Sequence, residues 1–200
     1  MLEFENELYA KGKSYIAGVD EVGRGPLAGP VCAAAVILPK DLIIDGINDS
    51  KKLTEKKRDA LFDEIKEKAL AYSIQFVEPE VIDKINIRQA THLAMENAVK
   101  DLKVRPDHVL IDGNDNIPID APYTYIVKGD AKSQTIAAAS ILAKVSRDRL
   151  MKELDKEYPQ YGLGKHKGYG TKAHMEAIQK YGVAKIHRQS FMTDKVLGKA

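Results

Sequence analysis

The sequence predicts one compact domain of the α/β class. Short apolar runs that suit β-strands alternate with longer segments in which apolar residues recur every three or four positions, as they do in helices. The chain has 200 residues, 44% of them hydrophobic and 30% charged, so it can bury a core and has a globular composition. No repeat, low-complexity segment or linker divides the sequence, so we expect a single domain over residues 1–200.

Five short runs of apolar and β-branched residues predict strands. The first two runs are joined by a glycine-rich loop, and the last two are followed closely by an aspartate beside a glycine. Pro39 and a polar stretch end the first pair. In chain order, the predicted strands are residues 15–19, 31–38, 72–77, 109–111 and 123–127.

Helices are predicted from apolar spacing and from the residues that begin and end them. Thr54 is a suitable N-cap, a turn is expected at Pro79, Pro159 stops the longest helix, and Gly182 stops the last one. The predicted helical segments are the end of a helix within residues 1–12, a helix after Thr54, a long region that includes residues 87–98, and helices at 134–157 and 171–180.

Composition limits the location of the protein more than its function. The single cysteine, Cys32, excludes an intrachain disulfide, and its apolar neighbours predict a small buried side chain. The N-terminus carries acids where a signal peptide carries bases, and no apolar run is long enough to span a bilayer. We therefore expect a cytoplasmic protein with no membrane partner.

The net charge is only +2, but the end of the chain is basic. Residues 161–200 contain eight lysines and arginines against two acids, interleaved with aromatic residues. A basic helical C-terminal segment over residues 160–200 suits a polyanion, and a solvated tail explains the same charges equally well.

Acidic residues follow three of the predicted strands. Asp20 and Glu21 precede a loop rich in glycine and proline, and Asp112 and Asp130 come after the two later strands. Carboxylates that converge at strand ends repel one another unless cations lie among them, and hard oxygen ligands select Mg²⁺ or Mn²⁺. Two such ions can support phosphodiester cleavage.

The adjacent acids pose a geometric problem, because successive strand residues face opposite sides of a sheet. A strand end or a bulge at Glu21 would bring its carboxylate beside that of Asp20, and the glycines that follow make either one plausible. Asp112 or Asp130 alone would be an ordinary turn residue. The common position of the acids after apolar runs favours the metal site.

Six segments, in the same order, resemble ribonuclease HII, and the likeness runs from about residue 15 to residue 191. They are 20–30 (Asp-Glu-Val-Gly-Arg-Gly-Pro-Leu-Ala-Gly-Pro), 48–53 (Asn-Asp-Ser-Lys-Lys-Leu), 111–113 (Ile-Asp-Gly), 128–130 (Lys-Gly-Asp), 137–144 (Ala-Ala-Ala-Ser-Ile-Leu-Ala-Lys) and 166–169 (His-Lys-Gly-Tyr). The resemblance implies a ribonuclease H-like fold, with a central five-stranded mixed sheet flanked by helices.

The resemblance also implies an activity. Such an enzyme hydrolyses the RNA strand of RNA–DNA hybrids and cuts on the 5′ side of a single ribonucleotide in duplex DNA, leaving 3′-hydroxyl and 5′-phosphate ends. It uses Mg²⁺ or Mn²⁺, acts as a monomer, and serves ribonucleotide and RNA primer removal. Arg24 separates the chain from ribonuclease HIII, which is similar but lacks that arginine. Residues 191–200 show no motif for a sliding clamp, so no such partner is expected.

Roles carry over by position in the shared segments. The acidic metal site would be Asp20, Glu21, Asp112 and Asp130. A loop that grips the ribonucleotide and its 2′-hydroxyl through backbone groups would be Gly23, Arg24 and Gly25, and Tyr169 would stack on the neighbouring deoxyribose. Residues that fit phosphate contacts are Lys51, Ser140, Lys144 and Lys167.

Some of these residues have ordinary alternatives. Packing around residues 137–143 explains the alanines near Ser140 equally well, and His166 and His187 are read as polar surface or substrate-side histidines. Two other functions stay open. A different two-metal nuclease of the same fold, such as a junction resolvase, would cut four-way DNA without a ribonucleotide. A non-catalytic binding module would need a degraded carboxylate set, and all four acids are present.

Overall fold

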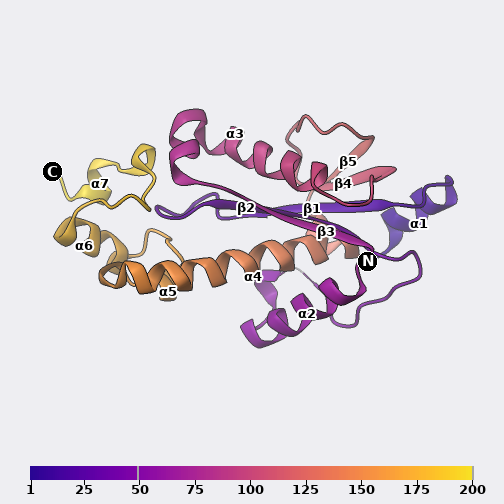
Figure 1. The fold of residues 1–200 in the computed structure, drawn as a ribbon, viewed down its shortest axis with the longest axis horizontal. Coiled ribbons are helices and arrows are strands. Elements are labelled where there is room, and N and C mark those ends of the chain that lie inside the picture. Colours follow the sequence, from indigo (N-terminus) through magenta and orange to yellow (C-terminus); the bar gives the residue numbers. More distant parts are fainter. Residues whose placement is uncertain (49, 200) are drawn as a thin grey trace.

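A five-stranded mixed sheet forms the centre of the computed structural model, which describes residues 1–48 and 50–199 (Figure 1). The strands are β1 (Ile16–Val22), β2 (Val31–Ile37), β3 (Ala71–Val77), β4 (His108–Asp112) and β5 (Tyr123–Ile126). Their order in the sheet is β3-β2-β1-β4-β5, in which β1 pairs antiparallel with β2 and parallel with β4. The prediction of a five-stranded mixed sheet is confirmed.

Helices cover both faces of this sheet. Figure 1 shows α3 on one face and α4 with α2 on the other, while α6 and α7 lie at the opposite end of the molecule from α1. The helices are α1 (Glu3–Ala10), α2 (Glu55–Lys68), α3 (Pro79–Lys100), α4 (Gln134–Glu157), α5 (Leu163–His166), α6 (Lys172–Tyr181) and α7 (Asp194–Leu197). Short 3₁₀ turns are η1 (Ser50–Lys52), η2 (Gly129–Ala131), η3 (Pro159–Tyr161) and η4 (Gln189–Phe191).

Two residues expected to mark helix boundaries have different outcomes. Thr54 caps α2 by accepting a hydrogen bond from the backbone N–H of Lys57, as the sequence predicts. Pro79 does not lie in a turn, because it opens α3 at the first helical position, where its missing N–H costs nothing. Helix α3 then kinks at Asn86, whose φ is +68°.

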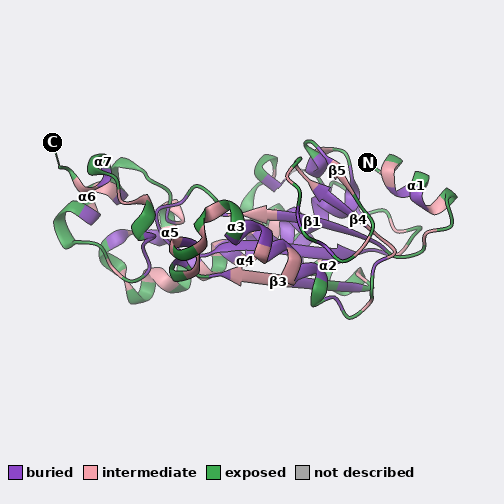
Figure 2. Cartoon of the chain, turned by 90° about the horizontal axis from the view of Figure 1, so that it is seen from above, coloured by how far each residue is buried: buried purple, intermediate pink, exposed green. Residues whose placement is uncertain are grey.

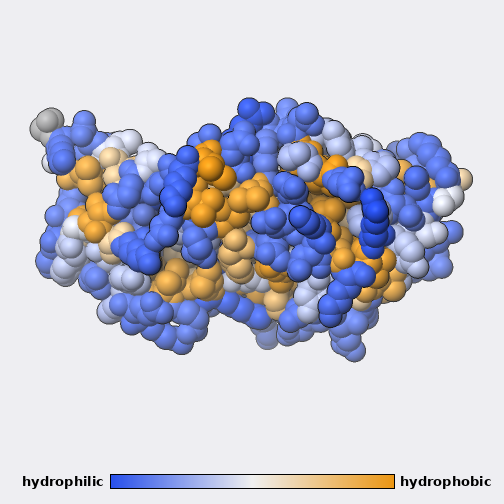
Figure 3. Space-filling view, turned by 45° about the horizontal axis from the view of Figure 1, so that its top comes forward, coloured by the Kyte–Doolittle hydropathy of each residue, from blue (hydrophilic) through white to orange (hydrophobic). Residues whose placement is uncertain are grey.

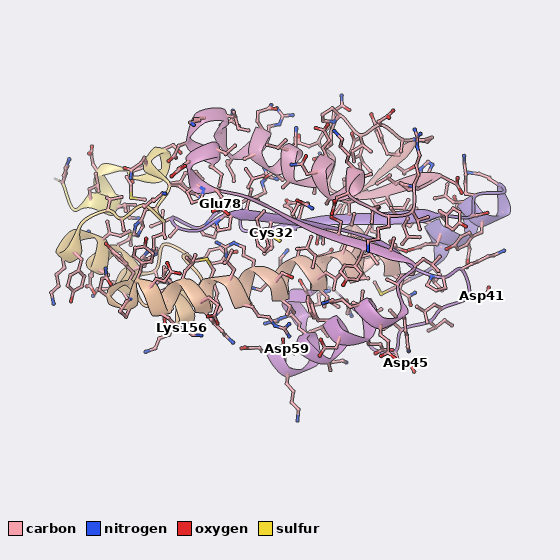
Figure 4. The ribbon with its side chains drawn as sticks, in the orientation of Figure 1. Cys32, Asp41, Asp45, Asp59, Glu78 and Lys156 are labelled. Carbon is pink, nitrogen blue, oxygen red and sulfur yellow. The ribbon has the colours of Figure 1, made fainter. Side chains whose placement is uncertain are left out.

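Small side chains bring the three layers close together. Every residue of β2 is buried, and the middle of the sheet is largely purple, the colour of buried residues, in Figure 2. The side chains of β2 alternate between the core under α3 and the core under α4. Cys32 belongs to the α4 side and lies near the middle of the molecule (Figure 4), and burial raises the pKa of its thiol. In β1, a Cβ on Gly18 would lie 2.3 Å from the carbonyl carbon of Thr135, so only glycine lets α4 approach this strand.

The basic C-terminal segment has a core of its own. Its apolar side chains include Tyr161, Leu163 and Ile178, and they pack with Leu27 of the loop after β1 and with Met151 of α4. The solvated-tail alternative is therefore wrong for the described part of this segment, because the segment covers the loop that follows the acid pair.

The face in Figure 3 is mostly hydrophilic, with apolar residues in patches between polar ones. None of the helices within residues 1–48 and 50–199 has the length and apolar content needed to cross a bilayer.

Candidate active site

Three of the four predicted carboxylates meet where the parallel strands β4 and β5 end beside β1. The β1–β4 register pairs Val19 with Ile111, so Asp20 and Asp112 follow at the same level and on the same side of the sheet. Asp130 joins them from η2, after β5. One carboxylate oxygen from each of these aspartates lies within 4.8 Å of the other two. The structure therefore brings Asp20, Asp112 and Asp130 into one acidic cluster.

Glu21 approaches this cluster from the other face of the sheet. Strand β1 continues to Val22, and the ladder with β2 pairs Asp20 with Ala34 and Glu21 with Ala33 without interruption. The expectation of a strand end or a bulge at Glu21 is therefore wrong, because β2 still supplies a partner on one side after β4 has ended. Ala34 faces α4 and Ala33 faces α3, so the two acids of β1 point to opposite sides.

The Glu21 carboxylate nevertheless interacts with the cluster. It lines an open pocket with Asp112 at the end of β4 and with Thr91 and Met95 of α3. Burial raises the pKa of Glu21, the nearby Arg24 guanidinium lowers it, and the charge of Asp112 raises it. Arg24 forms an ion pair with Glu21 at 3.5 Å between Nη1 and Oε1. Asp112 lies at the end of β4, so its carboxylate belongs both to the acidic cluster and to the pocket that Glu21 lines on the other face of the sheet.

Crowding and burial disfavour the ionised form of Asp20. Its side chain is 5% exposed, and burial raises its pKa well above the usual range, with further contributions from the charges of Glu21 and Asp112. Hydrogen bonds from the Ser140 hydroxyl and from the backbone N–H of Glu21, at 2.7 Å, oppose this effect. Buried oxygen ligands with excess negative charge are the donor set that a hard divalent cation requires, so these residues fit a metal site.

Backbone geometry fixes the remaining acids of the cluster. The Oδ1 atom of Asp112 accepts a hydrogen bond from the backbone N–H of Gly129 at 2.6 Å. A Cβ on Gly129 would lie 2.6 Å from Cδ1 of Ile136 in α4, so a larger residue in the turn before Asp130 would have to displace the end of this buried side chain. Lys51 of η1 lines a separate pocket together with Asp112 and Asp130.

The loop after β1 is held by Arg188, a completely buried arginine. Its Nε donates to the carbonyl oxygen of Gly29 at 3.0 Å, Nη1 to that of Arg24 at 2.8 Å, and Nη2 to that of Gly23 at 2.6 Å. Burial lowers the pKa of Arg188 to about 9, so the guanidinium remains charged at neutral pH. Two of these three bonds fix Gly23 and Arg24, which are two of the three residues predicted to grip a ribonucleotide.

A second buried arginine holds the other end of this loop. Arg147 of α4 donates to the carbonyl oxygens of Pro30 at 2.8 Å, Lys167 at 3.0 Å and Ala28 at 3.1 Å. Sequence reasoning missed both arginines. The available signal was the loop itself, since a buried segment without regular structure needs donors for its carbonyl groups.

Tyr169 lies against the same loop. A Cβ on Gly25 would be 3.9 Å from the Tyr169 ring, which is in ordinary van der Waals contact range. The backbone N–H of Leu27 also donates to the carbonyl oxygen of Gly168 at 2.8 Å. Because Tyr169 is 42% exposed, part of its ring faces solvent beside the loop.

The predicted phosphate-contacting residues divide into two groups. Ser140 and Lys51 lie at the acidic cluster, where Ser140 also shares a 2.8 Å hydrogen bond with Ser50. Lys144 instead forms a 2.7 Å ion pair with Asp148, and Lys167 donates to the carbonyl oxygen of Gly164. Lys144 on α4 and Lys167 after α5 both lie near Asp148, outside the carboxylate group.

A series of hydrogen-bonded polar side chains beside Glu21 could not be predicted from the sequence. His92 of α3 lines the same pocket as Glu21, and its Nε2 lies 3.4 Å from Oδ2 of Asp115. Arg88 binds this aspartate through two nitrogens, at 2.9 and 3.2 Å. Only the fold places these residues next to the acidic cluster.

A 3-2-1-4-5 mixed sheet, with helices on both faces and carboxylates clustered where its parallel strands end, defines a nuclease of the ribonuclease H-like class. Residues 17–194 match the family model of Ribonuclease HII. The chain belongs to the ribonuclease HII family, and the resemblance noted in the sequence is confirmed.

Individual relatives agree with this assignment. Ribonuclease HII of Bacillus cytotoxicus is 60% identical over 191 residues, which cover 96% of this chain and 73% of that protein. The crystal structure of ribonuclease H2 from Pyrococcus horikoshii OT3 is similar with a TM-score of 0.78 and 27% identity, over 92% of this chain and 98% of that one. Bst-RNase HIII in complex with Mn²⁺ shares the fold at a TM-score of 0.72 and 18% identity, over 92% and 69% of the two chains. The protein is an endoribonuclease of the ribonuclease H group.

Proposed function

We propose that this protein hydrolyses the RNA strand of RNA–DNA hybrids and incises duplex DNA on the 5′ side of single ribonucleotides, with two Mg²⁺ or Mn²⁺ ions. The observation that carries the proposal is the acidic cluster of Asp20, Asp112 and Asp130 beside a loop fixed by buried arginines. This activity would serve the removal of ribonucleotides and RNA primers from DNA by a monomer in the cytoplasm.

The four acids have distinct places in this proposal. Asp20, Glu21 and Asp112 would be the principal metal ligands, and Asp130 would complete the second-metal side. Bound divalent ions supply an activated water and stabilise the leaving oxygen in phosphodiester cleavage. The residues themselves would hold such ions at a fixed point, because strands β1 and β4 and the Gly129 hydrogen bond to Asp112 position the carboxylates before substrate binds.

Recognition would use the loop and the tyrosine beside the cluster. Gly23, Arg24 and Gly25 would contact the ribonucleotide and its 2′-hydroxyl through backbone groups, which distinguishes RNA from DNA. Tyr169 would stack on the deoxyribose that follows, where a 2′-hydroxyl would clash. The nearness of Gly25 to the Tyr169 ring, 3.9 Å from the position of a Cβ on this glycine, supports this arrangement, because neighbouring nucleotides could reach the loop and the tyrosine together.

Cleavage of defined duplexes tests the proposal. A duplex with one embedded ribonucleotide, a uniform hybrid, an all-DNA duplex and a four-way junction are each incubated with Mg²⁺ or Mn²⁺, and the cuts are mapped. We expect incision 5′ of the ribonucleotide, with 3′-hydroxyl and 5′-phosphate ends. No incision there, or cleavage of all-DNA sites, would refute the proposal, and cutting of the four-way junction alone would favour a resolvase.

Two variants separate catalysis from recognition. Asp112→Asn should abolish cleavage while hybrid binding persists, since the amide keeps its volume and its acceptor but loses its charge. Full activity in Asp112→Asn would overturn the metal-site assignment. Tyr169→Ala should lose preference for the RNA-to-DNA junction more than hybrid binding, as measured by relative kcat/KM on the single-ribonucleotide duplex and the uniform hybrid.

A further inference from the structure

Tyr169 is held in place through its main chain. Its carbonyl oxygen, in the turn between α5 and α6, accepts hydrogen bonds from the backbone N–H of Thr171 at 2.8 Å and from Nδ1 of His174 at 3.0 Å. The ring itself is partly open to solvent, so the turn has to orient it. His174 is fully buried beneath this turn.

A second buried histidine completes the hydrogen bonding of His174. His187, expected from the sequence at the surface or against substrate, is only 1% exposed. The Tyr169 carbonyl oxygen can only accept, so Nδ1 of His174 carries the proton, and the neutral His174 ring accepts at Nε2 from Nε2 of His187 at 3.2 Å. Nδ1 of His187 then accepts the backbone N–H of Ala184 at 3.0 Å, while the carbonyl oxygen of Ala184 lies 3.2 Å from the same nitrogen. A chain of hydrogen bonds thus leads from Ala184 to the recognition tyrosine.

Surrounding aromatic rings fix this pair. His166 stacks on His174 with ring centroids 4.4 Å apart, and Tyr161 packs edge-on against His187 at 4.7 Å. Burial lowers the pKa of His174 to about 4 and also lowers that of His187, so both rings stay neutral at neutral pH. Within residues 1–48 and 50–199, the acidic cluster is the only group of three or more ligand atoms close enough together to hold a metal ion, and it does not include these histidines.

The same segment also binds the loop. The main chain of His187 forms an antiparallel bridge with Ala28, and the backbone N–H of Arg188 donates to Leu27 at 2.9 Å. The Arg188 side chain then fixes the carbonyl groups of Gly23 and Arg24. Two consecutive residues, His187 and Arg188, therefore connect Tyr169 to the loop of Gly23, Arg24 and Gly25.

We propose that His174 and His187 are positioning residues that hold Tyr169 at a fixed place relative to the loop of Gly23 and Gly25, and that this spacing determines the preference for an RNA-to-DNA junction. The proposal rests on the recognition role of Tyr169 proposed above. It assigns the buried histidine pair to substrate selectivity rather than to chemistry at the scissile phosphate.

Paired variants of His174 provide the test. His174→Phe fills the same space but removes the donor, whereas His174→Asn places an amide N–H near the position of Nδ1. For His174→Phe we expect the ratio of kcat/KM on a single-ribonucleotide duplex to that on a uniform hybrid to fall about tenfold, mainly through kcat, because a misplaced contact costs rate. His174→Asn should restore most of the ratio. His187→Phe should lower it as well.

A control and an independent readout keep the test decisive. Ile178→Val, in the same small core, should lower thermal stability without changing the ratio. A wild-type ratio in His174→Phe, an equal loss in Ile178→Val, or no recovery in His174→Asn would overturn the proposal. Imidazole ¹⁵N spectra of the wild-type protein should show His174 protonated on Nδ1 and His187 on Nε2, and the opposite tautomers would also overturn it. If wild type cuts no ribonucleotide duplex, the proposed function fails, while these spectra still test the hydrogen-bond chain.

Discussion

Removal of one carboxylate from the acidic cluster should stabilise the metal-free protein. Oxygens of Asp20 and Asp112 lie within 4.8 Å of each other, and two full charges at that distance repel by about 3 kcal/mol at an effective dielectric constant of about 20. The charge of Asp112 is one of the causes that raise the pKa of Asp20, after burial and the charge of Glu21. Asp112→Asn keeps the acceptor for Gly129 and should therefore gain about 1–3 kcal/mol.

Thermal unfolding in EDTA and in Mn²⁺ measures this effect. For a chain of this length, the gain corresponds to a Tm increase of about 2–12 °C in EDTA. Mn²⁺ should raise the Tm of the wild type more than that of Asp112→Asn, because the variant has lost a ligand. Asp115→Asn is the matched control, since Asp115 pairs with Arg88 outside the cluster and its loss should give no stabilisation. A Tm for Asp112→Asn at or below that of wild type in EDTA would refute the repulsion argument.

Three further predictions concern the elements around the site. Arg188→Met leaves three loop carbonyls without a donor and should cost about 3 kcal/mol or more in urea unfolding, with incision reduced over about tenfold. Gly18→Ala places a Cβ 2.3 Å from the carbonyl carbon of Thr135, and this overpacking should cost about 1–3 kcal/mol or more in the same assay. His174 has a folded pKa of about 4 against 6.5 for an ordinary histidine, so the unfolded chain binds more protons between these values. Its contribution, at most about 3 kcal/mol, should be fully present above pH 6.5 and lost as the pH falls towards 4, a slope that His174→Phe should remove.

Local patterns predicted most elements of the fold. The helix at Gln134–Glu157 and the cap at Thr54 follow from residues adjacent in sequence, and such signals act within one turn. The end of β1 did not follow from them. Its apolar run stops at Val19, but pairing with β2 carries the strand to Val22 and turns Glu21 to the α3 face. A distant partner, rather than local propensity, decides where that strand ends.

The site shows the same division between local and distant information. Asp20 and Asp112 could be predicted together because both follow apolar runs that become neighbouring parallel strands. Arg188 and His174 could not, because each acts on a segment that only the folded chain brings near it. Arg188 is separated by 165 positions from Gly23, whose carbonyl group it fixes. In sequence, both look like ordinary polar residues of a basic C-terminal segment.

The most direct test of the account is the position of Mn²⁺ in a crystal of the protein, located by anomalous scattering. The account predicts anomalous peaks within coordination distance of Asp20, Asp112 and Asp130, and a Glu21 carboxylate that joins them from the α3 side. A protein that cleaves hybrid with Mn²⁺ but shows no peak among these carboxylates, or binds the ion elsewhere, would contradict the account.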